Sequence, residues 1–168
     1  MGVRERLQNN PKRLEWLYKT THNMILGMKP MISRLGMERF ERFVVGVERW
    51  SKEKIFDCRM CGQCVLHSTG MTCPMSCPKN LRNGACGGVR ENGHCEVIPE
   101  MKCVWVEAFE RSQMMGVYGD EILHVQPPVN RQLEGKSAWV TMLTGEDKDV
   151  PAAWVGINNI PVIDSANK

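Results

Sequence analysis

The sequence predicts a mainly α protein with a long irregular Cys-rich metal-binding loop region and few or no strands. Apolar residues recur at the 3.6-residue helical period in the first third of the chain. All eight cysteines lie between residues 58 and 103, among glycines and prolines that interrupt regular structure. We therefore expect an N-terminal helical support (1–56), a Cys-rich metal module (57–103), and a C-terminal helix with an extended, partner-docking tail (104–168).

The N-terminal support is expected to start with a helix after Pro11, because proline suits the first helical turn. Leu14 and Leu17 follow at the spacing of one helix face. Gly27 and Pro30 are expected to break this helix, since a proline inside a helix removes a backbone hydrogen bond and clashes with the preceding turn.

A second helix is expected from about Met37 to Lys54, leading into the first cysteine. Its apolar residues recur at helical spacing and are expected to be buried: Phe40, Phe43, Val44, Val47 and Trp50. Its charged residues are expected to face solvent: Glu38, Arg39, Glu41, Arg42, Glu48 and Arg49. We interpret this helix as a support for the cysteine region.

Beyond the cysteines, residues 104–116 are expected to form another helix, and a short one is expected around Trp139 and Leu143. Residues 145–168 show no clear period. This tail is expected to be extended and to contribute to docking on a partner.

The composition excludes several classes of protein. A formal net charge of +3, with acidic and basic residues interspersed, gives no reason to expect nucleic-acid binding. No run approaches the eighteen apolar residues that a membrane span needs. The N-terminus carries Arg4, Glu5 and Arg6 and shows no signal peptide, so we expect a cytoplasmic chain. Thiols are kept reduced in the cytoplasm, and dense cysteine there indicates metal binding rather than disulfides.

The cysteine spacing favours iron–sulfur chemistry. Cys58, Cys61 and Cys64 form a C-x2-C-x2-C triplet, in which each thiolate can bind one iron of a cubane while a fourth ligand comes from elsewhere. Structural zinc sites more often use cysteine pairs, or a pair with spaced histidines. Two zinc sites of four cysteines each nevertheless remain possible by count.

Eight cysteines suffice for two [4Fe–4S] clusters. The expected ligands are Cys58, Cys61, Cys64, Cys73, Cys77, Cys86, Cys95 and Cys103. Spacing does not decide which late cysteine completes the triplet, and Cys77 is our expectation. No catalytic residue is expected on this chain, because it shows neither a hydrolytic triad nor a dinucleotide-binding fingerprint. These features are typical of an electron-transfer subunit whose catalytic cofactor sits on another polypeptide.

The cysteine motifs resemble the small subunit, often labelled a C-terminal domain, of methylenetetrahydrofolate reductases. The similar motifs are C-x2-C-G-x-C from Cys58, C-P-x2-C-P-K-x2-R-N-G-x-C-G-G from Cys73, G-x-C-E-V around Cys95, and C-V-W from Cys103. The R-Q-L-E-G run at residues 131–135 is similar too. The outer thirds of the chain match only in general character.

The resemblance implies a complex with the flavin-bearing large subunit, a TIM barrel that holds FMN and the folate. This chain, with two [4Fe–4S] clusters, would relay electrons between that FMN and ferredoxin or a heterodisulfide-reductase-like donor. The reaction would be 5,10-methylene- to 5-methyl-tetrahydrofolate, or its reverse, in the reductive acetyl-CoA pathway of anaerobes. Zinc has also been suggested in this family, and similar domains occur beside corrinoid methyltransferases. A zinc-binding assembly subunit of either system is therefore the alternative.

Overall fold

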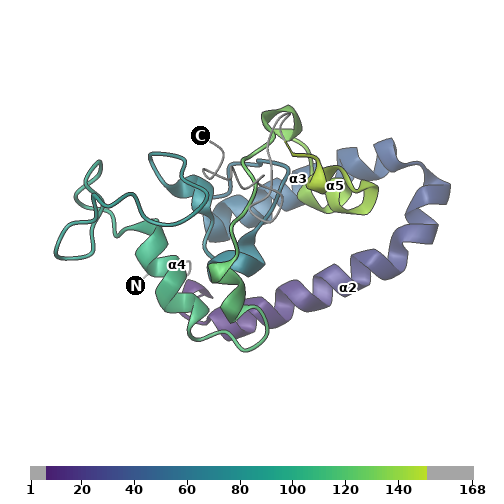
Figure 1. Ribbon diagram of the computed structural model, residues 1–168. Coiled ribbons are helices and arrows are strands. Elements are labelled where there is room, and N and C mark those ends of the chain that lie inside the picture. The colour runs from purple at the N-terminus through teal and green to yellow at the C-terminus, as the bar shows by residue number, and fades with distance from the viewer. Residues whose placement is uncertain (1–6, 151–168) are drawn as a thin grey trace, which may run out of the picture.

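The computed structural model describes residues 7–150, and its N-terminal part is a helical hairpin (Figure 1). Helix α2 (Pro11–Leu35) and helix α3 (Met37–Phe56) are joined by Gly36 alone. The φ of Gly36 is 93°, a conformation that glycine adopts without steric cost, so the chain can reverse between two long helices.

Helix α2 continues through Gly27 and Pro30, so the predicted break is wrong. A proline inside a helix costs about 3 kcal/mol, and packing on its two sides offsets this cost. Ile25 and Ile32 flank the proline and are buried in one cluster with side chains of α5 (Ala138–Thr144). Tertiary packing of this kind stabilises most helices in proteins more than local propensity does.

The predicted buried face of α3 is also wrong for most of its length. Phe43 is 73% exposed, Val47 54% and Trp50 69%. Glu48 and Lys52, on another face of the helix, are buried instead. Glu48 and Lys52 lie one helical turn apart and form an ion pair. Because each charge is paired with the other, this face of α3 can be buried even though it is charged.

The cysteine region, residues 57–103, has little regular structure. It contains two short 3-10 turns, η1 (Leu66–Thr69) and η2 (Pro74–Ser76), and one isolated antiparallel bridge between His94 and Lys102. No strand occurs within residues 7–150. The predicted fold class, mainly α with a long irregular Cys-rich loop region, is therefore confirmed.

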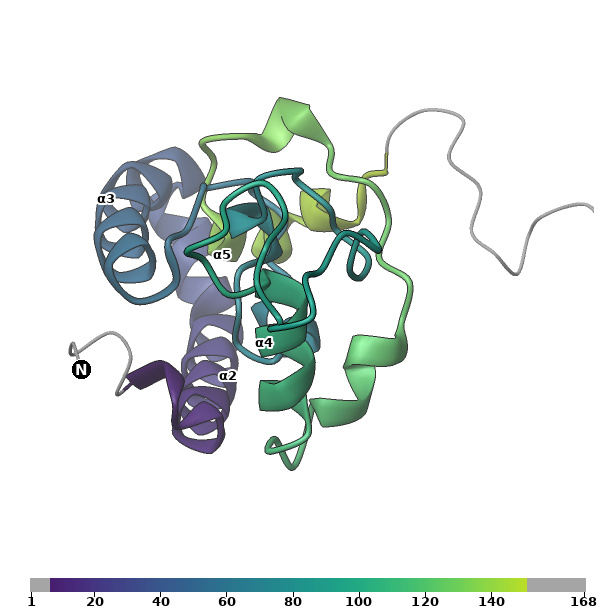
Figure 2. The ribbon, with the colours of Figure 1, turned by 90° about the vertical axis from the view of Figure 1, so that its left-hand side faces the viewer.

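The C-terminal part begins with helix α4 (Val104–Ser112), and the loops of the cysteine region gather at the N-terminal end of this helix (Figure 2). The remaining elements are α5 and three 3-10 turns, which are η3 (Gly119–Leu123), η4 (Arg131–Leu133) and η5 (Glu146–Lys148).

Both helices that the sequence predicts after the cysteines are therefore present, the first of them shorter than expected. Residues 151–168 of the expected docking tail lie outside the described residues. None of the helices described is both long enough and apolar enough to cross a membrane.

A single carboxylate ties the start of α2 to the turn that follows α4. Glu15 is 5% exposed and accepts hydrogen bonds from the backbone N–H groups of Gly116, Val117 and Tyr118 at 3.0, 2.8 and 2.8 Å. Burial alone would raise the pKa of Glu15, but the three hydrogen bonds to its charged form outweigh burial and lower it. Glu15 is thus a charged tether between segments about one hundred residues apart.

Replacement of this tether should destabilise the fold. We expect Glu15→Gln to lower the free energy of unfolding by about 2 kcal/mol at pH 7, because hydrogen bonds to charged groups contribute about 1.5–3 kcal/mol. The folded-state pKa of Glu15 is lowered, so its contribution is present above the ordinary carboxyl pKa and is lost as pH falls through the folded value.

Urea unfolding of wild type and variant, repeated at decreasing pH, measures both effects. Glu53→Gln is the control, because Glu53 forms only an exposed ion pair with Arg49 at 3.9 Å and should change stability by less than about 0.5 kcal/mol. Equal losses in the two variants, or a Glu15→Gln deficit that grows towards low pH, would contradict this account.

Candidate metal centres

The structure divides the eight cysteines into two sets of four, and each set lines its own cavity of about 20 Å³. The first set is Cys58, Cys61, Cys64 and Cys73. The second set is Cys77, Cys86, Cys95 and Cys103. All eight are free thiols. Within residues 7–150, no three His, Cys, Asp or Glu side chains converge closely enough to hold a single metal ion.

The first set lies in the loop that leaves α3. Asp57 ends the helix with a φ of 54°, and this left-handed turn directs the chain into Cys58. Gly62 has a φ of 73°, and a Cβ there would lie 2.3 Å from the carbonyl oxygen of Leu133, so only glycine fits. The Gly62 carbonyl also accepts a 2.6 Å hydrogen bond from Thr141 of α5. The loop is therefore held from two sides.

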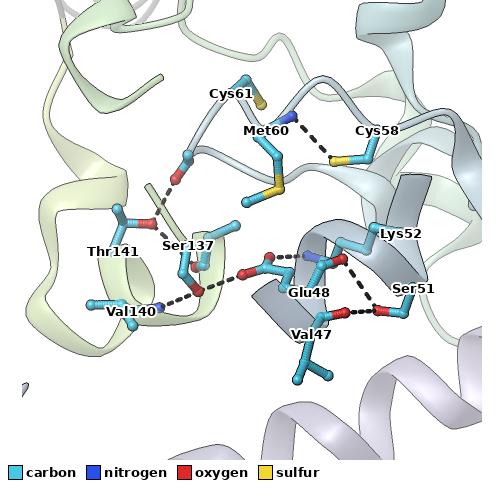
Figure 3. Close-up of polar contacts among 12 residues, drawn as sticks. Val47, Glu48, Ser51, Lys52, Cys58, Met60, Cys61, Ser137, Val140 and Thr141 are labelled. Atoms are coloured by element: carbon cyan, nitrogen blue, oxygen red, sulfur yellow. Dashed lines mark hydrogen bonds and ion pairs between the residues drawn. The ribbon is translucent and has the colours of Figure 1, made fainter. Parts of the chain in front are cut away.

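A buried polar network supports this loop from below (Figure 3). The Nζ of Lys52 donates to one oxygen of Glu48 at 2.5 Å, and the hydroxyl of Ser137 donates to the other. Burial opposes the charge of Lys52, but the neighbouring Cys64 and Glu48 side chains outweigh burial and raise the pKa of Lys52. The network joins α3 to α5, and Glu48 itself lines the cavity of the first set.

The two sets meet at η2. Cys73 is the residue directly before this turn and Cys77 the residue directly after it. Cys73 lines the first cavity and Cys77 the second. The structure therefore favours Cys73, rather than the expected Cys77, as the fourth cysteine of the triplet, although Cys61 and Cys77 also line a separate, wider cavity together. The paired substitutions described below test this choice.

The second set is assembled from a folded-back loop and the start of α4. The backbone N–H of Cys95 donates to the Met101 carbonyl, and that of Cys103 to the Gly93 carbonyl, both at 2.9 Å. These two bonds hold Cys95 and Cys103 beside one another. Cys86 reaches the same cavity from a separate loop and is solvent-exposed. The second set is therefore nearer to solvent than the first.

The electrostatic surroundings of the two sets differ. Beside the second set, Glu96 accepts hydrogen bonds from Lys79 and from the Cys86 thiol, the latter at 3.6 Å. Lys79 and Glu96 form an exposed ion pair whose charges cancel. Beside the first set, Arg82 is buried and lines the cavity. Burial lowers the pKa of Arg82, although an arginine keeps its proton in proteins.

Burial also affects the protonation of three cysteines of the first set. It raises the pKa of Cys58 to about 12 and that of Cys73 to about 11, and it raises the pKa of Cys61 as well. Without a metal these cysteines are therefore thiols at neutral pH. Metal ligation requires thiolates, so loading of the first set would release protons.

These features define a helical scaffold that carries two four-cysteine cavities in an irregular loop. Residues 37–132, more than half of the chain, match the family described as methylene-tetrahydrofolate reductase C terminal. The chain belongs to this family, which confirms the resemblance seen in its cysteine motifs. The matched residues include all eight cysteines. Among curated proteins and solved structures, no significant match was found.

Sequence reasoning missed three charged residues near the first set. Arg82 stands in the R-N-G run of the family-like motif, and nothing in the spacing shows that it is buried against cysteines. The spacing of Glu48 and Lys52 could have predicted their ion pair, since opposite charges four residues apart on a helix lie close enough to pair. The helical spacing of Phe43, Val47 and Trp50 instead predicted that their face of α3 would be buried, and these three residues are exposed.

The division into two sets predicts the effect of paired substitutions on metal content. Cys73→Ser and Cys77→Ser should each remove or degrade one centre and lower bound metal to about half. Adding Cys61→Ser to Cys73→Ser should cause little further loss, because both residues line one cavity. Combining Cys73→Ser with Cys77→Ser should abolish both centres, because these residues line different cavities.

Metal analysis per chain of anaerobically purified protein measures these losses. Cys73→Ser and Cys77→Ser are matched controls for one another, since the same substitution is made at the two ends of one turn. A Cys73→Ser/Cys77→Ser protein that retains half of its metal would show that the two residues serve one centre.

Proposed function

We propose that this chain is the iron–sulfur electron-transfer subunit of a flavin-dependent methylenetetrahydrofolate reductase. It relays electrons between a donor, ferredoxin or a heterodisulfide-reductase-like module, and the FMN of the large catalytic subunit. The observation that carries this proposal is the sorting of eight cysteines into two cavities of four, one of which contains the C-x2-C-x2-C triplet.

The donor atoms of both cavities fit the proposed clusters. Each cavity offers four cysteine sulfurs, and soft thiolate ligands select iron–sulfur clusters or zinc over hard cations. A buried arginine beside the first set supplies a positive charge next to ligands that become negative on loading. When bound, the clusters would supply reversible one-electron transfer; the residues described here hold and insulate them.

The position of the two sets suits a relay. Cys73 and Cys77 lie four residues apart across η2, and the rise of a 3-10 turn, about 2 Å per residue, places their Cα atoms on the order of 8 Å apart. Centres held by these residues would be direct neighbours. Exposed Cys86 brings the second set close to solvent, whereas the first lies between α3 and α5. The chain thus offers an outer and an inner centre in series.

The apolar face of α3 supports assembly with a partner. Phe43, Val47 and Trp50 lie at helical spacing on one face and are all more than half exposed. Exposed apolar patches of this kind are typical of protein–protein contacts. The proposed partner is the flavin-bearing large subunit, because this chain belongs to a reductase family and its sequence shows no flavin-binding fingerprint.

The proposal predicts the metal and its redox behaviour. Anaerobically purified chain should be brown, contain about eight irons with matching acid-labile sulfide, and give an EPR signal on reduction. In the complex, Cys61→Ser should slow flavin reduction by the physiological donor, because the first centre is damaged. Glu91→Gln, an exposed change between the cysteine motifs, is the control and should leave both readouts unchanged.

Two outcomes would contradict the proposal. A colourless chain that holds only zinc would establish the alternative, a zinc-stabilised assembly subunit without a redox role. Flavin reduction that proceeds at the wild-type rate after loss of the first centre would show that this centre is structural.

A further inference from the structure

Arg82 is the least satisfied charged group in the part of the chain that the structure describes. Its side chain is 8% exposed and lines the cavity of the first set. Its Nη2 donates to the Gln63 carbonyl at 3.1 Å. Its Nε and Nη1 are buried and have no hydrogen-bond partner. No ion pair within residues 7–150 joins Arg82 to a carboxylate.

A buried cation with two unused donors is costly. Leaving a buried charged donor without a hydrogen-bond partner destabilises a protein more than leaving a neutral donor unpaired does. The cost is removed if a negative group occupies the space that the donors face. Arg82 lines the same small cavity as the four cysteines of the first set, Cys58, Cys61, Cys64 and Cys73. The missing anion is therefore supplied by the first set itself once its thiols are ionised.

We propose that Arg82 is the charge-compensating hydrogen-bond donor of the metal centre held by the first set. This inference rests on the proposed function for the presence of a centre, and not for the identity of its metal. The N–H groups of Nε and Nη1 donate to ligand sulfur atoms of the loaded centre, and the guanidinium offsets part of its negative charge. Arg82 is a positioning residue: it acts on the centre through the cysteines and touches no substrate.

Two measurable consequences follow for the first centre. Loss of the positive charge weakens metal retention, because four thiolates on one centre repel one another without a counter-charge. It also lowers the reduction potential of an iron–sulfur centre, since hydrogen bonds and nearby positive charge favour the more negative, reduced state. The second centre should respond much less, because Arg82 lines the cavity of the first set and not that of the second.

The side-chain shape of Arg82 matters as well as its charge. The guanidinium fork presents its donors at fixed angles. Nη2 donates to the Gln63 carbonyl, and the other two nitrogens are unpaired in a side chain that lines the cavity of the first set. A lysine would keep the charge but offer one compact ammonium group. Arg82→Lys should therefore show a smaller change than Arg82→Gln, in the same direction. If Arg82 only filled space, the effect of Arg82→Lys would not be smaller than that of Arg82→Gln.

The test uses the full chain, purified anaerobically with its native metal, as wild type, Arg82→Gln, Arg82→Lys and the exposed control Arg90→Gln. Metal release to a chelator in excess and an EPR-monitored reductive titration are measured on each. Repeating both in a Cys86→Ser background, which lacks an intact second centre, isolates the first.

For Arg82→Gln we expect several-fold faster release of about half of the metal. We also expect at least a tenfold change in the reduction equilibrium of one centre, a shift of about 59 mV to lower potential for a one-electron couple. Arg82→Lys should lie between Arg82→Gln and wild type, and Arg90→Gln should match wild type.

Wild-type release and potential in both Arg82 variants would overturn the inference, as would equal effects on the two centres. If Arg82→Gln does not fold, Arg82→Lys decides, because unchanged release from it also overturns the inference. If the metal proves to be zinc, the proposed electron transfer fails while the release experiment still tests Arg82, since a four-thiolate zinc site is also anionic.

Discussion

The structure depends on how residues 57–103 are held in place, because this segment contains eight cysteines and almost no regular structure. In helices and sheets the backbone N–H and C=O groups form hydrogen bonds with one another, whereas an irregular segment needs hydrogen-bond partners from elsewhere. Here the outside contacts include the hydrogen bonds from Thr141 to the Gly62 carbonyl and from the Gly135 N–H to the Met60 carbonyl. Within the segment, Arg82 donates to the Gln63 carbonyl, and backbone bonds flank the His94–Lys102 bridge. Ligation of the proposed centres would add the rest, since binding energy of metal sites is also folding energy.

The first set lies beside buried charged and polar side chains rather than on an apolar core. Glu48, Lys52 and Ser137 are all buried and connect α3 to α5 directly beneath it. A buried ion pair seldom adds net stability over apolar packing, but removal of one partner leaves a costly unpaired charge. We infer that this network fixes the position of the cysteine loop relative to the helices more than it adds to stability. Arg82 would extend the same principle, because the proposed loading of the first set would complete its pairing.

The general architecture was accessible from sequence, and the details that matter for the site were not. Helical periodicity predicted both long helices, and clustered cysteines with many glycines predicted an irregular metal-binding region. Periodicity failed on α3, where Phe43, Val47 and Trp50 suggested the buried face while an ion pair determined it. It failed at Pro30, where packing against α5 keeps α2 continuous. Cysteine spacing could not separate Cys73 from Cys77, because the orientation of a three-residue turn decides which cavity each one lines.

We propose that this family member carries two separate iron–sulfur centres, one in each four-cysteine cavity. The most direct measurement is anomalous X-ray diffraction from anaerobic crystals, recorded on both sides of the iron and zinc absorption edges. Two separate iron–sulfur centres would give two iron peaks, one beside Cys73 and the other beside Cys77, and no zinc peak at either position. A single peak, peaks that appear only at the zinc edge, or one centre bound by both of these cysteines would contradict it.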